Sequence, residues 1–121
     1  MDVRVQVILT LMEEDLRQVP KPRELARIVR LSSSRFNHLF TAETGFSPSQ
    51  YLKALRMEKA KVLLESTFLN VKEIMTSVGL SDLSHFVRKF KKLYGITPSE
   101  YRKRHANPTL IKEQLQTPER Q

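Results

Sequence analysis

The sequence predicts an all-α protein of about seven helices, arranged as two similar helical units joined by a central linker helix. Three observations lead to this prediction. The chain repeats itself after about fifty residues. Apolar residues recur at the three- and four-residue spacing of amphipathic helices in both copies. No segment is predicted to form a strand. With 121 residues, the chain has room for one ordinary domain or two very small ones packed together.

The repeat is clearest where residues 34–53 are aligned with residues 84–103. This shift of 50 pairs identical residues: Ser34, Phe36, Phe40, Gly45, Pro48, Ser49, Tyr51 and Lys53 match Ser84, Phe86, Phe90, Gly95, Pro98, Ser99, Tyr101 and Lys103. Upstream the shift is 49, so the second copy has gained one residue between Ser81 and Ser84. Because a unit this short cannot bury a core alone, we expect the copies to support each other.

An opening helix and a helical pair make up the first copy. The apolar face of the opening helix is expected from Val5, Ile8, Leu9, Met12 and Leu16, with a cap near Asp2. A short helix with Leu25, Ile28 and Val29 on its inner face follows Pro22. Ser32 then caps a helix whose inner face carries Phe36, Leu39 and Phe40, and Gly45 ends it. Ala26 is the small residue expected where the two helices cross.

The second copy repeats this order. Asn70 caps a short helix with Ile74, Met75 and Val78 inward, and Gly79 makes the turn. Asp82 caps the next helix, which carries Phe86, Phe90 and Leu93 and ends at Gly95. Residues 47–50 and 97–100 each spell a capping box with proline at the first helical position. These boxes mark the starts of helices, and we assign them no role in function.

The boundaries of the parts follow from these elements. We predict a first helix–turn–helix subdomain at 1–48, a linker helix at 49–65, a second subdomain at 66–105 and a flexible polar tail at 106–121. Apolar residues of the linker helix are too widely distributed for a single stripe, which favours packing on two sides.

Charge, cysteine content and the absence of catalytic motifs limit the functions that the sequence allows. There are 21 Lys and Arg against 13 Asp and Glu, and the formal charge of +8 predicts an anionic partner. No cysteine is present, which excludes disulfides, thiolate nucleophiles and cysteine-held metals. His38, His85 and His105 lack the spacing of metal ligands, and glycine-rich phosphate loops and G-x-S-x-G elbows are absent. We therefore expect no enzyme, no cofactor and no metal site.

No apolar run approaches the roughly 20 residues that a membrane span requires. We therefore expect no membrane association, no signal peptide and a cytoplasmic location.

The outer faces of the two second helices carry the candidate binding residues. Helical wheels centred on the buried phenylalanines turn two sets of side chains outward: Ser34, Asn37, His38 and Thr41 in the first copy, and Ser84, Val87, Arg88, Lys91 and Lys92 in the second. Asparagine pairs bidentately with adenine and arginine with guanine, and lysine neutralises phosphates. The pattern is typical of a helix that enters the major groove of DNA.

These residues resemble a known family. GLSDLSHFVRKFKK at residues 79–92, followed by GITPSEYR at 95–102, is similar to the signature of AraC/XylS-type bacterial transcription regulators. The first copy, from Leu25 to Pro48, is similar to that family's first helix–turn–helix. The resemblance covers residues 3–104. It implies a fold of seven helices with two recognition helices, which bind double-stranded DNA in a sequence-specific manner and read successive segments of the major groove.

Carried over residue by residue, the resemblance implies DNA contacts from one set in each copy: Ser33, Ser34, Asn37 and His38, and Leu83, Ser84, His85, Val87 and Arg88. Two residues depart from the family pattern. Arg30 stands where the first turn often has glycine, and a left-handed conformation there would cost roughly 1–2 kcal/mol. His85 replaces a more usual aromatic residue.

Other expectations concern partners. The family's effector-sensing or dimerising domain is not among these 121 residues, so the chain is either a solitary member or an excised C-terminal domain. We expect a monomer for this segment, with a dimer as the alternative, formed through a missing domain or through Val5, Leu9 and Met12 of the opening helix. RNA polymerase is the further expected partner. The sequence leaves two other functions open, a sequence-blind architectural DNA-binding module and a protein-interaction domain.

Overall fold

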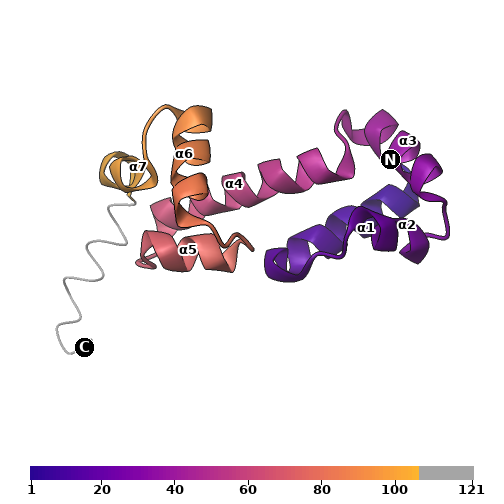
Figure 1. Ribbon diagram of the computed structural model, residues 1–121, viewed down its shortest axis with the longest axis horizontal. Coiled ribbons are helices and arrows are strands. Elements are labelled where there is room, and N and C mark those ends of the chain that lie inside the picture. The colour runs from indigo at the N-terminus through magenta and orange to yellow at the C-terminus, as the bar shows by residue number, and fades with distance from the viewer. Residues whose placement is uncertain (107–121) are drawn as a thin grey trace. The chain divides into compact units, whose positions relative to one another are not determined.

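The computed structural model describes residues 1–106, and within them the fold is all-α, with seven α-helices and one short 3-10 helix. The helices are α1 (Val3–Glu14), η1 (Leu16–Gln18), α2 (Pro22–Ile28), α3 (Ser33–Thr44), α4 (Pro48–Ser66), α5 (Val71–Ser77), α6 (Leu83–Tyr94) and α7 (Pro98–His105) (Figure 1). The predicted fold class is confirmed. None of these helices is both long and apolar enough to cross a membrane.

The chain divides into two compact units, and the division falls inside α4. Unit 1 comprises Met1–Arg56, and unit 2 begins at Met57. The finer partition at residues 48, 65 and 105 stays a prediction. The expected polar tail lies outside the described residues, except for Ala106.

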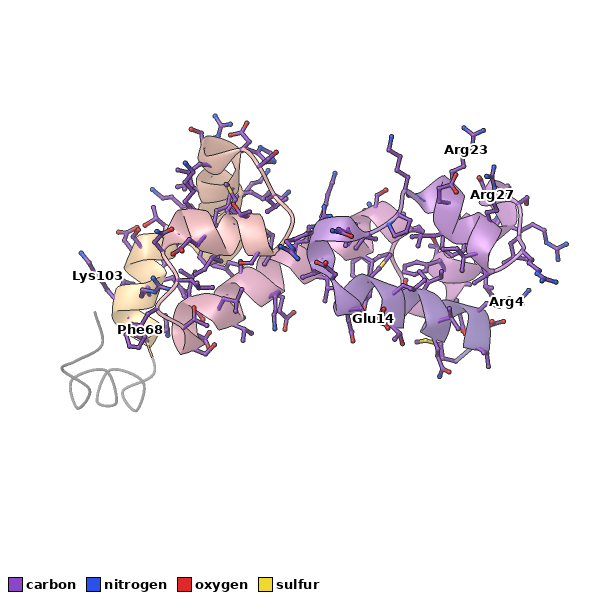
Figure 2. All side chains as sticks on the ribbon, turned by 90° about the horizontal axis from the view of Figure 1, so that it is seen from below. Arg4, Glu14, Arg23, Arg27, Phe68 and Lys103 are labelled. Carbon is purple, nitrogen blue, oxygen red and sulfur yellow. The ribbon has the colours of Figure 1, made fainter. Side chains whose placement is uncertain are left out.

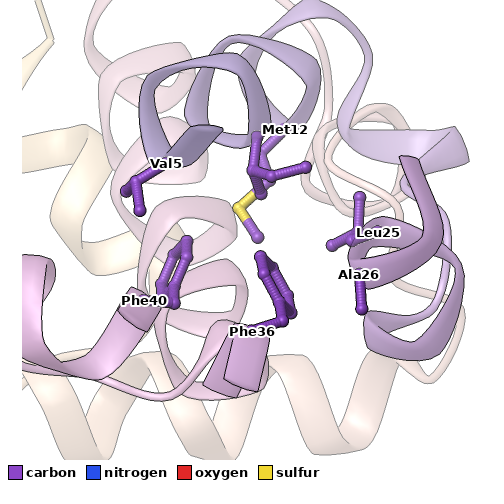
Figure 3. Close-up of a cluster of buried hydrophobic side chains, with 7 residues drawn as sticks. Val5, Met12, Leu25, Ala26, Phe36 and Phe40 are labelled. Carbon is purple, nitrogen blue, oxygen red and sulfur yellow. The ribbon is translucent and has the colours of Figure 1, made fainter. Parts of the chain in front are cut away.

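In unit 1 the core is built around two phenylalanines of α3. Phe36 and Phe40 lie between Val5 and Met12 of α1 and the α2 pair Leu25 and Ala26 (Figure 3). The rings of Phe36 and Phe40 are 5.8 Å apart and tilted by 57°. All six side chains are 1% exposed or less, so these residues lie inward as expected, and the small residue Ala26 is buried in the same cluster.

Unit 2 repeats this core with different residues. Val5, Ile8 and Met12 are buried in α1, and Met57, Ala60 and Leu64 are buried in α4 with the same spacing of three and four residues. The second half of α4 therefore contributes to the core of unit 2 the apolar face that α1 contributes to the core of unit 1.

Edge-to-face aromatic pairs show that α7 likewise matches the first half of α4. The ring centroids of Phe40 and Tyr51 are 5.6 Å apart at 84°, and those of Phe90 and Tyr101 are 5.6 Å apart at 76°. Such pairs add about 0.5–1.5 kcal/mol to the burial of the rings. The helix α4 thus closes one unit and opens the next.

Two arginines fasten these helices to backbone carbonyls. In unit 1, Arg56 Nη2 donates to the Leu16 carbonyl at 2.9 Å. In unit 2, Arg102 Nε donates to the Leu64 carbonyl and Nη2 to the Thr67 carbonyl, both at 3.2 Å. A cation at the C-terminal end of α4 also interacts favourably with the helix dipole.

Next to Arg102, the Tyr101 hydroxyl donates to the Glu65 carboxylate. Burial, reinforced by that hydrogen bond, raises the pKa of Tyr101 to about 12.

The turn of each helix–turn–helix pair has the same hydrogen bonds but a different residue. The amide of Leu31 donates to the Ala26 carbonyl, and the amide of Leu80 to the Met75 carbonyl, both at 3.0 Å. This Schellman arrangement requires a left-handed residue, which is Arg30 with φ of 61° in unit 1 and Gly79 with φ of 89° in unit 2. The left-handed conformation expected at Arg30 is confirmed.

The structure corrects several expected core positions. Ile28 is 50% exposed and Leu93 is 51% exposed, so neither belongs to the inner face of its helix. Leu16 is buried but lies in η1, beyond the end of α1. Because Val5 and Met12 are fully buried in their own unit, these two side chains are not available to a dimer interface.

Candidate nucleic-acid interface

The orientation of α3 is set by its cap and its two phenylalanines. The Ser32 hydroxyl accepts a hydrogen bond from the Arg35 amide at 3.2 Å, which starts the helix at Ser33. Gly45, in the left-handed conformation with φ of 84°, ends it. With Phe36 and Phe40 buried, the opposite side of the helix must face solvent.

That outer side holds every residue predicted for the first copy. Ser33, Ser34, Asn37, His38 and Thr41 are all exposed. Four of them, Ser34, Asn37, His38 and Thr41, line one open depression on the surface. Sequence reasoning therefore placed these side chains on a common surface, and the structure brings them together.

A second outer face lies on α6. Asp82 accepts a hydrogen bond from the His85 amide at 3.0 Å and starts the helix at Leu83. Leu83 is 41% exposed. Ser84, His85, Arg88, Lys91 and Lys92 are exposed as well, whereas Val87 is half-buried beside them. Val87 therefore offers a methyl group at the edge of this face.

The predicted polar side chains have no hydrogen-bond or ion-pair partner in the part of the chain that the structure describes. Inside residues 1–106, none of the serine, asparagine, histidine, threonine, arginine and lysine side chains predicted for α3 and α6 makes a hydrogen bond or an ion pair. Their polar atoms are therefore exposed to solvent and available to a ligand.

Charge separates the two faces. Residues 33–44 hold Arg35 against Glu43, while residues 83–94 hold four basic residues and no acid. The nearby acid Glu100 is engaged in the capping box of α7, whose N-cap is Thr97. Hydrogen bonds with Thr97, and then the charges of Lys91 and Arg104, hold the pKa of Glu100 below its usual value. The α6 face is therefore strongly cationic and the α3 face polar but nearly neutral.

Sequence reasoning did not include the basic residues of α2 and of the turn that follows it. Arg23, Arg27 and Arg30 are exposed in unit 1, and Figure 2 shows the first two at the edge of that unit. The signal was present in the excess of basic residues between Lys21 and Ser32, but the wheels covered only the second helix of each pair.

A metal centre finds no support in the described part of the chain, since no group of three or more His, Asp or Glu side chains there could hold an ion.

Comparisons with known proteins agree with this geometry. A model of the helix-turn-helix domain family matches residues 25–104. The uncharacterized HTH-type transcriptional regulator YdiP of Escherichia coli is 34% identical over 106 residues, which are 88% of this chain and 35% of that protein. The arabinose operon regulatory protein of Escherichia coli is 38% identical over 78 residues, covering 64% of this chain and 27% of that protein. The chain thus spans about a third of the length of the curated relatives that it matches.

Solved structures extend the likeness to the fold. An AraC-type transcriptional regulator from Chromobacterium violaceum has a TM-score of 0.79 at 28% identity, covering 88% of this chain and 95% of that one. The DNA-binding domain of AdpA, a global transcriptional factor solved with a target DNA, has a TM-score of 0.75 at 26% identity, covering 85% and 92%. With the matched repeat, caps and recognition helices, these likenesses show that the chain belongs to the AraC-type helix–turn–helix family of transcription regulators.

Proposed function

We propose that this chain binds double-stranded DNA at a specific sequence, as the DNA-binding part of a bacterial transcription regulator, with α3 and α6 reading successive segments of the major groove. The observation that carries the proposal is the pair of exposed polar faces, each fixed by two buried phenylalanines and each without partners inside the described chain. The likeness to the AdpA domain, which was solved with its target DNA, supports it.

The residue roles follow from side-chain chemistry. Asn37 in α3 and Arg88 in α6 suit bidentate contacts to adenine and guanine, each worth about 1–3 kcal/mol of discrimination. His38, Thr41, Ser84 and His85 add single hydrogen bonds to base edges or phosphates. Leu83 and Val87 suit thymine methyl groups, and Lys91 and Lys92 neutralise phosphates. Ser33 and Ser34, in the first turn of α3, suit a phosphate near the helix N-terminus.

This mechanism uses binding alone. It needs no cofactor, metal or covalent step, and we therefore propose that the chain is not an enzyme. Because bacterial chromosomal DNA lies in the cytoplasm, the proposed function requires a cytoplasmic location. A contact with RNA polymerase belongs to the same proposal, because the relatives are named transcription regulators.

Binding-site selection with the purified chain tests the proposal. A random duplex library is incubated with the protein, and bound molecules are recovered and sequenced over several rounds. We expect a single enriched motif with two separate blocks of preferred bases. Binding without enrichment would instead identify a sequence-blind architectural module, and absence of binding would identify a protein-interaction domain.

The matched control is Asn37→Ala, which removes one proposed base contact from an exposed position and leaves the core of unit 1 intact. Under the proposal it relaxes one base position in one block and leaves the other block unchanged.

A further inference from the structure

The exposed side of α2 carries arginines at a helical spacing. Arg23, Arg27 and Arg30 are four and three residues apart, so they fall along one side of the helix and its turn. All three are exposed, and Arg23 and Arg27 project at the edge of unit 1 (Figure 2). We call this surface the α2 arginine stripe.

Hydrogen bonds and ion pairs among the described residues do not account for the stripe. Its one ion pair within residues 1–106 joins Arg27 to Glu24 at 3.7 Å, and both of those side chains are mostly exposed. Arg23 and Arg30 have neither an ion pair nor a side-chain hydrogen bond in that part of the chain. An exposed pair at this distance contributes little to stability.

Arg30 is held in a backbone conformation that glycine adopts more easily. Its φ is 61°, and the equivalent residue of unit 2 is Gly79 with φ of 89°. A strained residue whose side chain makes no hydrogen bond or ion pair within residues 1–106 points to a use outside the fold. An unpaired guanidinium, on a unit that we propose binds DNA, is suited to bind an anion.

The twin helix of unit 2 lacks such a surface. Residues 21–32 hold four basic residues against Glu24, whereas residues 70–81 hold Lys72 against Glu73. The recognition helices show the reverse contrast, since α3 is nearly neutral and α6 is strongly basic. Each helix–turn–helix pair therefore has one cationic helix, the first in unit 1 and the second in unit 2.

We infer that the α2 arginine stripe binds DNA phosphates beside the site that α3 reads. The first helix of a helix–turn–helix pair crosses the DNA backbone, which makes its exposed side the place for phosphate contacts. A guanidinium presents a planar fork of donors that matches two phosphate oxygens. The inference rests on the proposed function and adds to it the residues that supply the electrostatic affinity of unit 1.

The test is the salt dependence of binding by the complete chain. The variants Arg23→Ala, Arg27→Ala and Arg30→Gly are compared with Arg17→Ala, which removes the same charge from another exposed site of unit 1. Affinity is measured by fluorescence anisotropy on the selected duplex and on an unrelated duplex. Each lost phosphate contact lowers the steepness of log affinity against log salt by about 0.9. When the salt concentration is raised fourfold, the affinity of such a variant should therefore fall by a factor about 3.5 times smaller than the factor for the parent.

We expect that reduced slope for each stripe variant on both duplexes, with an unchanged ratio between the two affinities, and no change for Arg17→Ala. For Arg30→Gly the affinity should fall while the melting temperature rises, because the substitution removes strain and charge together. This opposite movement separates loss of a DNA contact from damage to the fold.

Slopes equal to that of the parent in all stripe variants would overturn the inference, and would assign the stripe to another partner, such as an acidic protein surface. The proposed function would still stand if the parent chain prefers its selected site. If the parent shows no preference for the selected duplex over the unrelated one, it is the proposed function that fails.

Discussion

Arg30 shows how one backbone angle ties stability to function in this chain. Its turn makes the same hydrogen bonds as the turn at Gly79, so the geometry is dictated by the fold and not by the side chain. A residue with a Cβ pays roughly 1–2 kcal/mol for that geometry, and glycine does not.

We therefore predict that Arg30→Gly stabilises unit 1. Relief of the left-handed conformation exceeds the extra entropy of glycine in the unfolded chain, which leaves a net gain of about 0.5–1 kcal/mol. Thermal unfolding followed by circular dichroism should show a rise of about 2–5 °C in melting temperature. Arg30→Ala is the control, because it removes the same side chain but keeps the strained Cβ. An equal gain in both variants would attribute the effect to charge and not to φ.

Arg88 carries the second prediction at this scale. Arg88→Ala should weaken binding to the selected site by about 1–3 kcal/mol and relax the preference at one base position, because a bidentate contact to guanine is lost. Site selection repeated with the variant measures this directly.

Lys91→Ala is the companion variant for Arg88→Ala. It should lower affinity on every duplex alike, because a phosphate contact carries no sequence information. A motif that survives Arg88→Ala unchanged would show that Arg88 reads no base.

Residues near the ends of helices were the hardest to place from the sequence. Ile28 and Leu93 fit the spacing of the inner face, yet both are about half exposed. Each lies in the last two residues of its helix, where the neighbouring elements no longer cover the expected side. Positions further inside the helices, such as Phe40 and Phe90, are fully buried and were predicted correctly.

At the scale of elements, the contrast between α3 and α6 predicts a division of labour. Lys92→Gln in α6 should lower the salt slope of binding by about 0.9, whereas Arg35→Gln in α3 should leave it nearly unchanged. The reason is that α6 holds four cations and no acid, while the single cation of α3 is balanced by Glu43. Both variants remove one exposed charge, so titrations of the two over the same salt range are directly comparable. Equal losses of slope would contradict this division.

Capping boxes supply a prediction about pH. Glu100 accepts a hydrogen bond from the Thr97 amide at 2.9 Å, and Gln50 accepts the equivalent bond from the Ser47 amide at 3.1 Å. The pKa of Glu100 is lowered in the folded state, so its contribution is present above the unfolded pKa and is lost as pH falls through the folded one. Glu100→Gln should keep the cap and reduce the loss of melting temperature between neutral pH and about pH 3.

The control for Glu100→Gln is Glu58→Gln on α4. The Glu58 carboxylate accepts no hydrogen bond within residues 1–106, so this variant removes a charge without touching a cap. If both variants flatten the acid dependence to the same extent, the cap is not its source.

For the whole molecule, we predict that one chain binds one asymmetric DNA site. Single helix–turn–helix proteins obtain two contacts by dimerising, and their palindromic sites mirror the two-fold axis. Here both readers lie in one chain and differ at matched positions, Asn37 against Val87 and His38 against Arg88. Two unlike readers should select two unlike half-sites, separated by about 34 Å along the DNA.

Stoichiometry on a short duplex, measured by analytical ultracentrifugation together with footprinting, checks this prediction. We expect one chain per duplex and protection of two major-groove segments on one DNA face. Two chains on a palindrome, or protection of a single groove, would refute it.

The overall fold was predictable because both copies of the repeat keep several of the same residues in the core and at the starts and ends of helices. Phe40, Gly45 and Tyr51 recur at the same shift, so one copy reports on the other. The sharing of α4 was harder to see. Val5, Ile8 and Met12 correspond to Met57, Ala60 and Leu64 by position and burial but at a shift of 52, and with no identical residue. The candidate α3 and α6 faces followed from the same periodicity, whereas the α2 stripe needed the exposure of each arginine.

The shared helix α4 has a consequence for the order of folding. Starting a helix is the costly step, and extending one is favourable or nearly neutral for each added residue. Whichever unit folds first therefore supplies the other with a helix that is already nucleated. If unit 1 folds first, extension of α4 brings Met57, Ala60 and Leu64 into helical positions for unit 2; if unit 2 folds first, extension towards the N-terminus does the same for Tyr51 in unit 1. The helix α4 therefore needs to be nucleated only once for the two cores, and the unit that folds second is accelerated by the unit that folds first.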